Sequence, residues 1–412
     1  MILTTSVKLA LRNTTRRRTR TLLTAGMVVL GVALLLLSLS WVGGIFQSIL
    51  STATALGGHV RIVQPKFAER EELSPLYENI PDVAPLEAAL RALPGVAGVE
   101  PRIMTGVTIS KGDQIGDVFG LVVGASERYF RERTSAKEKL IAGTWFTGGQ
   151  NEAVLGSKVA AEVGAKVGDE LILVGMTQDG SMSPIKVKLT GIAQMGVGGL
   201  DQQIFVPLGL VQYLVDIEGG ATELLVYGDN YEHADQLALQ LRAAPAVKDL
   251  TVQAWSEREP WRSLSGTVNG MQSVIVAVIV FLTALGIWNT MMMSVLERTH
   301  EIGVLRAMGL SRWGTVRLFV GEALAIAMLG GLLGVALGAY PAWLLETHGI
   351  TIGARTAAST SLMISETMRG DLNWTVTATA FCLGLLMALL GSLVPALRAA
   401  SIQPVAAMRG GR

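Results

Sequence analysis

The sequence predicts an α-helical membrane protein with four transmembrane helices and a large α+β extracytoplasmic domain inserted between helices 1 and 2. Of the 412 residues, 50% are hydrophobic and only 16% are charged, and the mean hydropathy is +0.45, unlike soluble globular domains. Four apolar runs are long enough to cross a bilayer core of about 30 Å. Between the first and second runs, short strand-like and helix-like segments alternate instead.

The N-terminal part predicts a membrane anchor. Residues 1–21 are rich in basic side chains, especially from Arg12 to Arg20, and indicate an interfacial helix on the cytoplasmic side. Residues 22–46 are apolar and predict transmembrane helix 1. A cleavable signal peptide is the alternative, favoured by the basic flank and by residues 38–40. The apolar run, however, is longer than that of a usual signal peptide.

Residues 47–262 predict an exported α+β domain in two lobes. Strand-like runs occur at 59–63, 118–123, 152–155, 170–174, 185–189, 203–206, 223–227 and 250–254. Helix-like runs occur at 85–93, 158–163 and 232–242. Residues 178–181, with the sequence Gln-Asp-Gly-Ser, predict a hairpin turn before the strand at 185–189.

The C-terminal part predicts three further spans. Transmembrane helices 2, 3 and 4 are expected at 263–294, 314–345 and 374–398. They are joined by a cytoplasmic coupling helix and loop at 295–313 and by an extracytoplasmic loop at 346–373, and residues 399–412 form a tail. The N-terminal segment, the 295–313 loop and the tail are all basic. The N and C termini are therefore expected in the cytoplasm, with residues 47–262 outside.

Small and acidic residues mark the third span. Gly330, Gly334 and Gly338 recur at four-residue spacing, which lets helix backbones approach closely in lipid. We expect helix packing within the chain, with a dimer contact as the alternative. Glu322 is expected to pair with Arg317 or Arg312 near the cytoplasmic interface; a buried functional carboxylate is the alternative.

The charged segment 297–310 predicts a docking helix. One broad side carries charged and large apolar residues: Glu297, Arg298, Glu301, Ile302, Leu305 and Met308. The opposite side carries the small residues Thr299, Gly303 and Ala307, which would pack closely against the chain itself. Gly309 suits the left-handed position after a helix, and Ser311 can cap the next helix. An ordinary solvated loop is the alternative.

Motifs for enzymatic chemistry are missing from the sequence. It has no G-x-x-x-x-G-K-[ST] phosphate loop, no H-E-x-x-H and no G-x-S-x-G, and its histidines (His59, His233, His300, His348) are scattered. We therefore expect no catalytic residue, no metal and no cofactor bound by this chain. The net charge of +1 gives no basic field, so a nucleic-acid partner is not expected.

Several stretches resemble one family of membrane proteins. Residues 11–23, 297–310, 322–324 with 330–334, and 395–409 are similar to those of the FtsX/MacB-type (type VII, mechanotransmission) ABC transporter permeases. The resemblance covers nearly the whole chain, as one span, a large extracytoplasmic domain and three spans. The layout is closest to the lipoprotein-releasing LolC/LolE permeases.

The resemblance implies a multi-pass permease in the inner membrane. Two copies of a separate ABC ATPase subunit would bind ATP and Mg under two permease chains, arranged as a homodimer or a related heterodimer. ATP hydrolysis would then drive the outer domain by mechanotransmission. A periplasmic carrier or adaptor and membrane lipid are further implied partners. The ATPase-coupling residues would be Glu297, Arg298, Glu301, Ile302, Gly303, Leu305, Arg306, Met308 and Gly309.

The substrate differs between branches of this family. Lipoprotein-releasing permeases extract acylated proteins, MacB exporters drive peptides, toxins or macrolides through an outer partner, and division-type FtsX proteins signal to cell-wall hydrolases. We expect extraction of lipoprotein or lipid-like substrates, although the turn at 176–184 is too short for the hook of that branch. The pocket would be lined by Leu37, Trp41, Phe46, Met271, Val274 and Val278, with plain lipid contact as the alternative. An alternative from another functional class is a membrane-tethered sensor whose outer domain recognises a ligand.

Overall fold

The computed structural model describes residues 18–71, 75–112, 114–134, 136–146, 148–149, 151–195, 199–351 and 367–403. The chain divides into two compact units. One comprises Met1–Gln47, Gly266–Ile350 and Met368–Arg412, and the other comprises Ser48–Ser265 with Thr351–Thr367. The predicted interfacial helix up to residue 17, residues 352–366 of the predicted outer loop and the tail beyond 403 lie outside the described residues.

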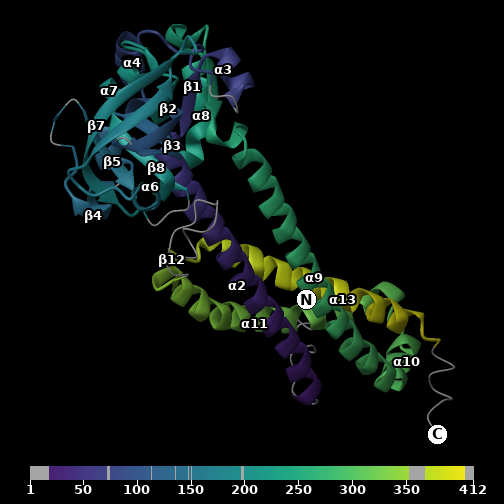
Figure 1. Cartoon of the computed structure of the whole chain (residues 1–412). Coiled ribbons are helices and arrows are strands. Elements are labelled where there is room, and N and C mark those ends of the chain that lie inside the picture. Colours follow the sequence, from purple (N-terminus) through teal and green to yellow (C-terminus); the bar gives the residue numbers. More distant parts are fainter. Residues whose placement is uncertain are drawn as a thin grey trace. The chain divides into compact units, whose positions relative to one another are not determined.

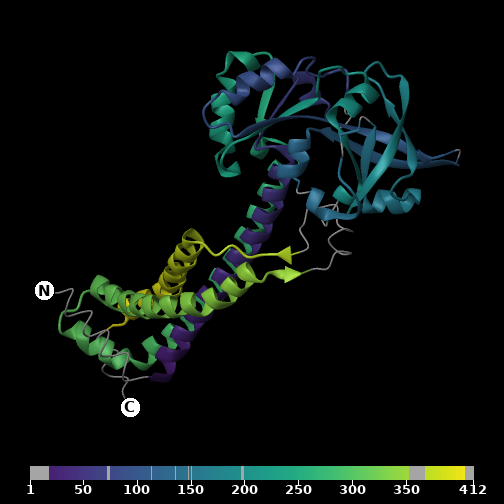
Figure 2. The ribbon, with the colours of Figure 1, turned by 90° about the vertical axis from the view of Figure 1, so that its left-hand side faces the viewer.

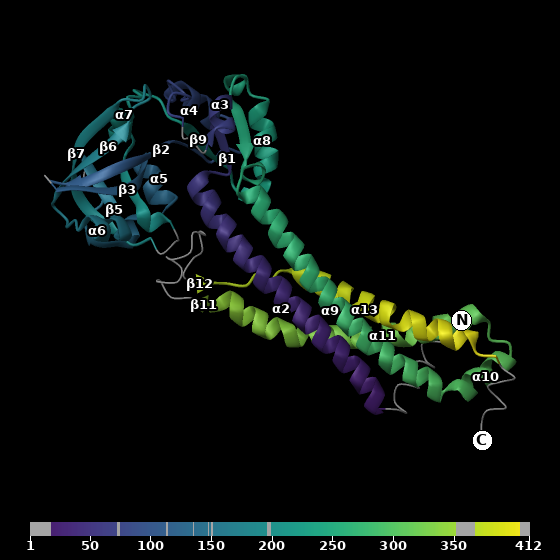
Figure 3. The same ribbon diagram turned by 45° about the vertical axis from the view of Figure 1, so that its right-hand side comes forward.

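The first unit is helical. Its long helices are α2 (Arg18–Gly57), α9 (Trp261–Glu297), α11 (Arg312–Thr347) and α13 (Trp374–Ser401), and α10 (Thr299–Ala307) is short. The end of α2 from Ser48 and the start of α9 up to Ser265 belong to the second unit. In the described part of the chain, four helices are long and apolar enough to span a membrane. α2 contains the predicted helix 1 and continues to Gly57, where Gly58 leaves the helix with a φ of 75°. Figures 1 and 3 show α11 and α13 side by side.

Close helix packing holds this unit together. The backbone of α11 contacts α2 at Gly330, Gly334 and Gly338. A Cβ atom on Gly334 would lie 2.7 Å from the carbonyl oxygen of Val29, and one on Gly338 would lie 2.9 Å from the Cα of Ala33. The structure therefore places the three glycines in a contact within the chain, where larger side chains would push the two helices apart.

The second unit is built on a ten-stranded sheet. Its strands are β1 (Val60–Val63), β2 (Gly98–Lys111), β3 (Gln114–Ala125), β4 (Leu140–Gly143), β5 (Glu152–Gly156), β6 (Glu170–Met176), β7 (Met182–Ala193), β8 (Gln203–Pro207), β9 (Glu223–Tyr227) and β10 (Thr251–Ala254). The strand order is β10-β1-β9-β2-β3-β8-β5-β7-β4, and β6 pairs with both β2 and β7. The helices are α3 (Pro65–Glu69), α4 (Ala84–Arg91), α5 (Glu127–Glu132), α6 (Ser157–Val163), α7 (Leu208–Val215) and α8 (Ala234–Arg242). A separate two-stranded sheet joins β11 (Ile350–Thr351) to β12 (Thr367–Met368).

The long strand β2 joins two lobes. Its first part pairs with β9 over Gly98–Arg102, and its last part pairs with β6 over Val107–Lys111. Strands β2, β3, β8, β5, β7 and β6 close into a ring, whereas β10, β1 and β9 extend β2 as an open sheet. The two predicted lobes are thus present and share a strand, as the long blue strands in Figure 2 and the separate strand groups in Figure 3 illustrate.

The predicted secondary structure lacks β2, the strand that joins the lobes. Apolar residues alternate from Val99 through Ile103 to Ile109, but Pro101 lies among them and argues against a central strand. Here Pro101 lies opposite Leu224 of β9. The predicted hairpin between β6 and β7 is confirmed: the Thr177 N–H donates to the Ser181 carbonyl at 2.8 Å.

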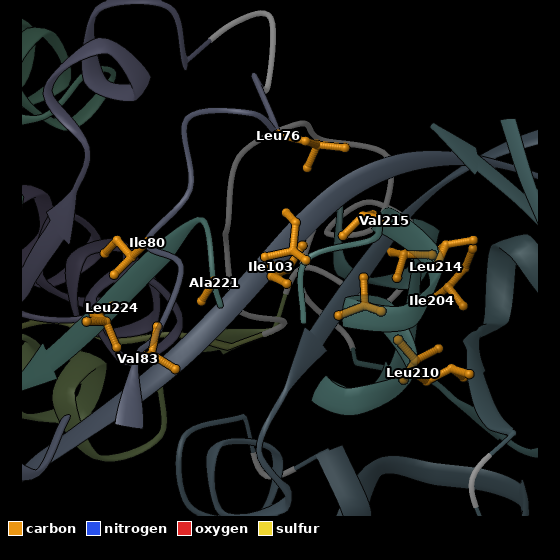
Figure 4. Packing of buried hydrophobic residues seen from close by; sticks show 14 of the residues in the cluster. Leu76, Ile80, Val83, Ile103, Ile204, Leu210, Leu214, Val215, Ala221 and Leu224 are labelled. Atoms are coloured by element: carbon orange, nitrogen blue, oxygen red, sulfur yellow. The ribbon is translucent and has the colours of Figure 1, made fainter. Parts of the chain in front are cut away.

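One apolar core continues through both lobes. In Figure 4, Leu210 and Leu214 of α7 lie near Ile204, and Ile80 and Leu224 lie on the other side of Ile103 of β2. All six side chains are buried. Because β2 contributes to the packing of both lobes, removing its apolar side chains would affect the two lobes together.

Candidate coupling site

The short helix α10 connects two long helices and has well-defined ends. α9 ends at Glu297, and Arg298 separates it from α10. Gly309 has a φ of 99°, the left-handed conformation predicted for it after the helix. The Ser311 hydroxyl accepts a hydrogen bond from the Gly314 N–H at 3.0 Å and caps α11, also as predicted.

One face of α10 is buried against the other helices of its unit. Gly303 is buried, and Ile302 is only 3% exposed in a cluster with Val295, Val316 and Phe319. The prediction that the side chain of Ile302 lies on the docking face is therefore wrong. Ile302 faces inward because residues of α9, α11 and α13 cover this side of α10, and Ala307, predicted to pack inward, is exposed.

Charged groups fix α10 to its neighbours. The Arg298 guanidinium donates to Glu301 at 3.1 Å and to Glu322 of α11 at 3.2 Å, and it lies 5.7 Å from the centre of the Phe319 ring. Glu322 thus pairs with Arg298 and not with Arg317 or Arg312, because the chain reversal brings the end of α9 beside α11. Arg306 donates to the carbonyl of Ile402, just after α13. Arg298 and Arg306 therefore act as tethers within the unit.

The remaining face of α10 is exposed. It carries charged residues and large apolar side chains, including Met308, which is 72% exposed. Trp313, in the first turn of α11, is 70% exposed and was missed in the sequence analysis, although a tryptophan directly after a helix cap was a visible signal. We call this set the coupling face: Glu297, Glu301, Val304, Leu305, Met308 and Trp313.

Comparison with known proteins identifies the family. A family model described as the MacB-like periplasmic core domain matches residues 21–252, and one described as the FtsX-like permease C-terminal matches residues 273–404. The chain belongs to the MacB/FtsX-like family of ABC permeases. With its four candidate membrane helices, this MacB/FtsX-like permease is a multi-pass inner-membrane protein.

Two kinds of relative are similar over nearly the whole permease. The macrolide export ATP-binding/permease protein MacB of a Shewanella species (strain W3-18-1) is 25% identical over 97% of this chain, which spans 60% of that relative's length. The lipoprotein-releasing system transmembrane protein LolE of Haemophilus influenzae is 24% identical over 92% of this chain and 91% of its own length. The periplasmic region of MacB from Actinobacillus actinomycetemcomitans is 14% identical, with a TM-score of 0.35, over 54% of this chain and 97% of its own.

The six residues predicted to line a substrate pocket lie on α2 and α9. Leu37, Trp41 and Phe46 of α2 are half-buried, whereas the α9 residues Met271, Val274 and Val278 are exposed. None of the six lines the pocket of about 660 Å³ in the outer domain. That pocket lies between the starts of α5 and α7 and is lined by Glu127, Phe146, Gly148, Gly149, Asn151, Pro207, Gly209, Leu210 and Tyr213.

His59 of the outer domain has a structural role. The described residues contain no group of three or more His, Cys, Asp or Glu side chains that could hold a metal. His59, next to β1, accepts a hydrogen bond at Nδ1 from the Gly228 N–H at 3.0 Å. Burial, and then the nearby Arg133, lower the pKa of His59 to about 4. His59 is therefore neutral in the folded domain near neutral pH.

This lowered pKa predicts an acid-sensitive outer domain. The folded pKa lies below the ordinary 6.5, so the contribution of His59 is complete above pH 6.5 and is lost as the pH falls towards 4. Because His59 is partly exposed, we discount the full effect and expect the free energy of unfolding of the outer domain to fall by about 2 kcal/mol. The loss of stability is measured by hydrogen exchange of the β1 and β9 amides at pH 7.5 and pH 5, corrected for intrinsic exchange rates. A His59→Gln variant with the same pH dependence as the wild type would contradict the assignment.

Proposed function

We propose that this permease uses ATP hydrolysis by a separate ABC ATPase subunit to drive its periplasmic domain by mechanotransmission, and that it extracts lipoprotein or lipid-like substrates from the inner membrane. The coupling face is the observation that carries the proposal. Met308, directly after α10, and Trp313, in the first turn of α11, are large apolar side chains that are strongly exposed, and such side chains fit a cleft on a partner protein. Glu297 and Glu301 would supply polar contacts at its rim.

The tethers of α10 support mechanical coupling. A push on the coupling face would pass through Ile302, Arg298 and Arg306 to α11 and α13, because these contacts prevent α10 from rotating alone. The ATP and Mg would be held by two copies of the ATPase under two permease chains. The N and C termini and α10 would lie in the cytoplasm, in line with their basic flanks.

The substrate class rests on the relatives and on α9. The LolE relative is similar over 91% of its own length, which supports a lipoprotein or lipid-like substrate. The apolar side chains that α9 exposes at Met271, Val274 and Val278 fit an acyl chain, with residues of α2 as the second wall. The MacB relatives support the alternative, export of peptides, toxins or drugs with a periplasmic adaptor. Signalling to cell-wall hydrolases is a third candidate function.

Affinity purification of the tagged permease from its native membranes tests this proposal. Proteins and lipids that co-purify would be identified by mass spectrometry. We expect an ABC ATPase subunit together with an acylated protein or lipid. An ATPase with an adaptor and no lipid cargo would replace extraction by export, and the absence of any ATPase would overturn the coupling role of α10.

A further inference from the structure

The outer end of α2 is capped by side chains of the outer domain. A helix leaves its last four carbonyl groups without partners inside the helix. Here Tyr227 of β9 donates its hydroxyl to the Ala55 carbonyl at 2.9 Å, and Tyr129 of α5 donates to the Leu56 carbonyl at 2.8 Å. Arg102 of β2 also donates to Leu56, at 2.5 Å. Three different elements of the domain thus hold the end of α2.

A fourth donor links the end of α2 to the start of α9. The Arg258 guanidinium donates to the Gly57 carbonyl at 2.8 Å. The backbone carbonyl of Arg258 in turn accepts the N–H of Arg262, in the first turn of α9, at 2.9 Å. One residue therefore contacts the last turn of the first long helix and the first turn of the second. We call Arg102, Tyr129, Tyr227 and Arg258 the helix-end clamp.

The helix-end clamp is buried and rigidly supported. All four residues are buried. Arg102 forms an ion pair with Glu223 at 2.9 Å, and Glu223 also faces Arg61 at 3.8 Å. Hydrogen bonds to charged donors in such surroundings are stronger than those at the surface, and the guanidinium groups also complement the negative end of the helix dipole. The end of α2 can therefore move only together with the sheet or after these bonds break.

We propose that the helix-end clamp is the joint through which displacement of α2 and α9 moves the outer domain; this rests on the mechanotransmission proposed above. Two features favour a role in transmitting movement over a purely structural cap of α2. Two of the four donors, Arg102 and Tyr227, come from β2 and β9, the strands at the junction of the two lobes, so a displacement reaches both lobes. Arg258 also makes the two helix ends move together.

The test uses the full permease with its co-purified ATPase in nanodiscs. Spin labels at Met182→Cys and Trp374→Cys, both strongly exposed, report the distance between the outer domain and the helical unit in a Cys382→Ser background. Each complex would carry one labelled copy. The distance distribution is measured with and without ATP in the wild type, in Tyr129→Phe/Tyr227→Phe and in Arg258→Gln.

In the wild type, we expect ATP to shift the equilibrium between a shorter and a longer distance. In the clamp variants, the change that ATP causes in this equilibrium constant should be about 3- to 30-fold smaller. Their ATPase activity and ATPase binding should stay near wild type. Arg258→Lys, which can still donate to Gly57, should restore the shift, and Tyr213→Phe, an exposed tyrosine on α7, is the matched control.

The outcomes separate the two proposals. If the wild type itself shows no ATP-dependent shift, the proposed function fails. If the wild type shifts and the folded clamp variants shift equally, the joint is wrong while the proposed function stands. Thermal unfolding of each variant identifies any that fail to fold; in that case the comparison of Arg258→Lys, which keeps a charged donor of long reach, with Arg258→Gln, which has only a shorter, neutral one, decides the question.

Discussion

Replacing Glu223 by glutamine should destabilise the outer domain of this permease by about 3–5 kcal/mol, the usual cost of leaving a buried charge unpaired. Glu223 is buried, and its carboxylate faces Arg102 at 2.9 Å and Arg61 at 3.8 Å. Burial alone would raise the pKa of Glu223, but Arg102 and Arg61 together hold it below its ordinary value. The amide removes the charge and leaves Arg102 without a counterion, whereas Arg61 keeps Glu71.

The loss should appear as faster hydrogen exchange of β2 and β9 in the full chain. Glu132→Gln is the control, because its pair with Arg128 lies at the surface, where solvent screens it, and its loss should leave the stability close to that of the wild type. The double variant Arg102→Gln/Glu223→Gln should lose less than the sum of the two single variants, since no unpaired charge remains. Strict additivity of the two changes would show that the ion pair is not the cause.

Replacing Met308 by aspartate should weaken binding of the ATPase by about 30-fold or more, as for a central apolar contact worth about 2 kcal/mol. Met308 is exposed at the end of α10 and does not belong to the buried cluster of the helical unit. The substitution should therefore leave the helical unit folded while it places a charge in the apolar cleft of the partner. Transport should fall with binding, and the ATPase subunit itself should remain active.

Binding of the purified ATPase to the permease in nanodiscs measures this effect. Met182→Asp, an equally exposed methionine on β7 of the outer domain, should bind like the wild type. Ile302→Asp gives a second comparison, because its buried side chain should cost stability of the helical unit and not only affinity. Wild-type binding by both Met308→Asp and Glu301→Lys would remove the coupling face from the mechanism.

Local signals in the sequence were sufficient for the main architecture. Long apolar runs identify the four candidate spans, because a bilayer sets their length. The hairpin before β7, the left-handed Gly309 and the cap at Ser311 follow from the backbone preferences of single residues and their neighbours. Each of these features depends on contacts within a few residues along the chain.

Only the tertiary structure decided which side chains of these elements face the interior. Ile302 and Leu305 are equally apolar, and their burial differs because α11 and α13 cover one side of α10. The partner of Glu322 is Arg298, from another helix, and the donors to the last turn of α2 come from β2, α5, β9 and the segment before α9. Spacing along one helix cannot reveal such contacts, because they depend on how distant segments fold against each other.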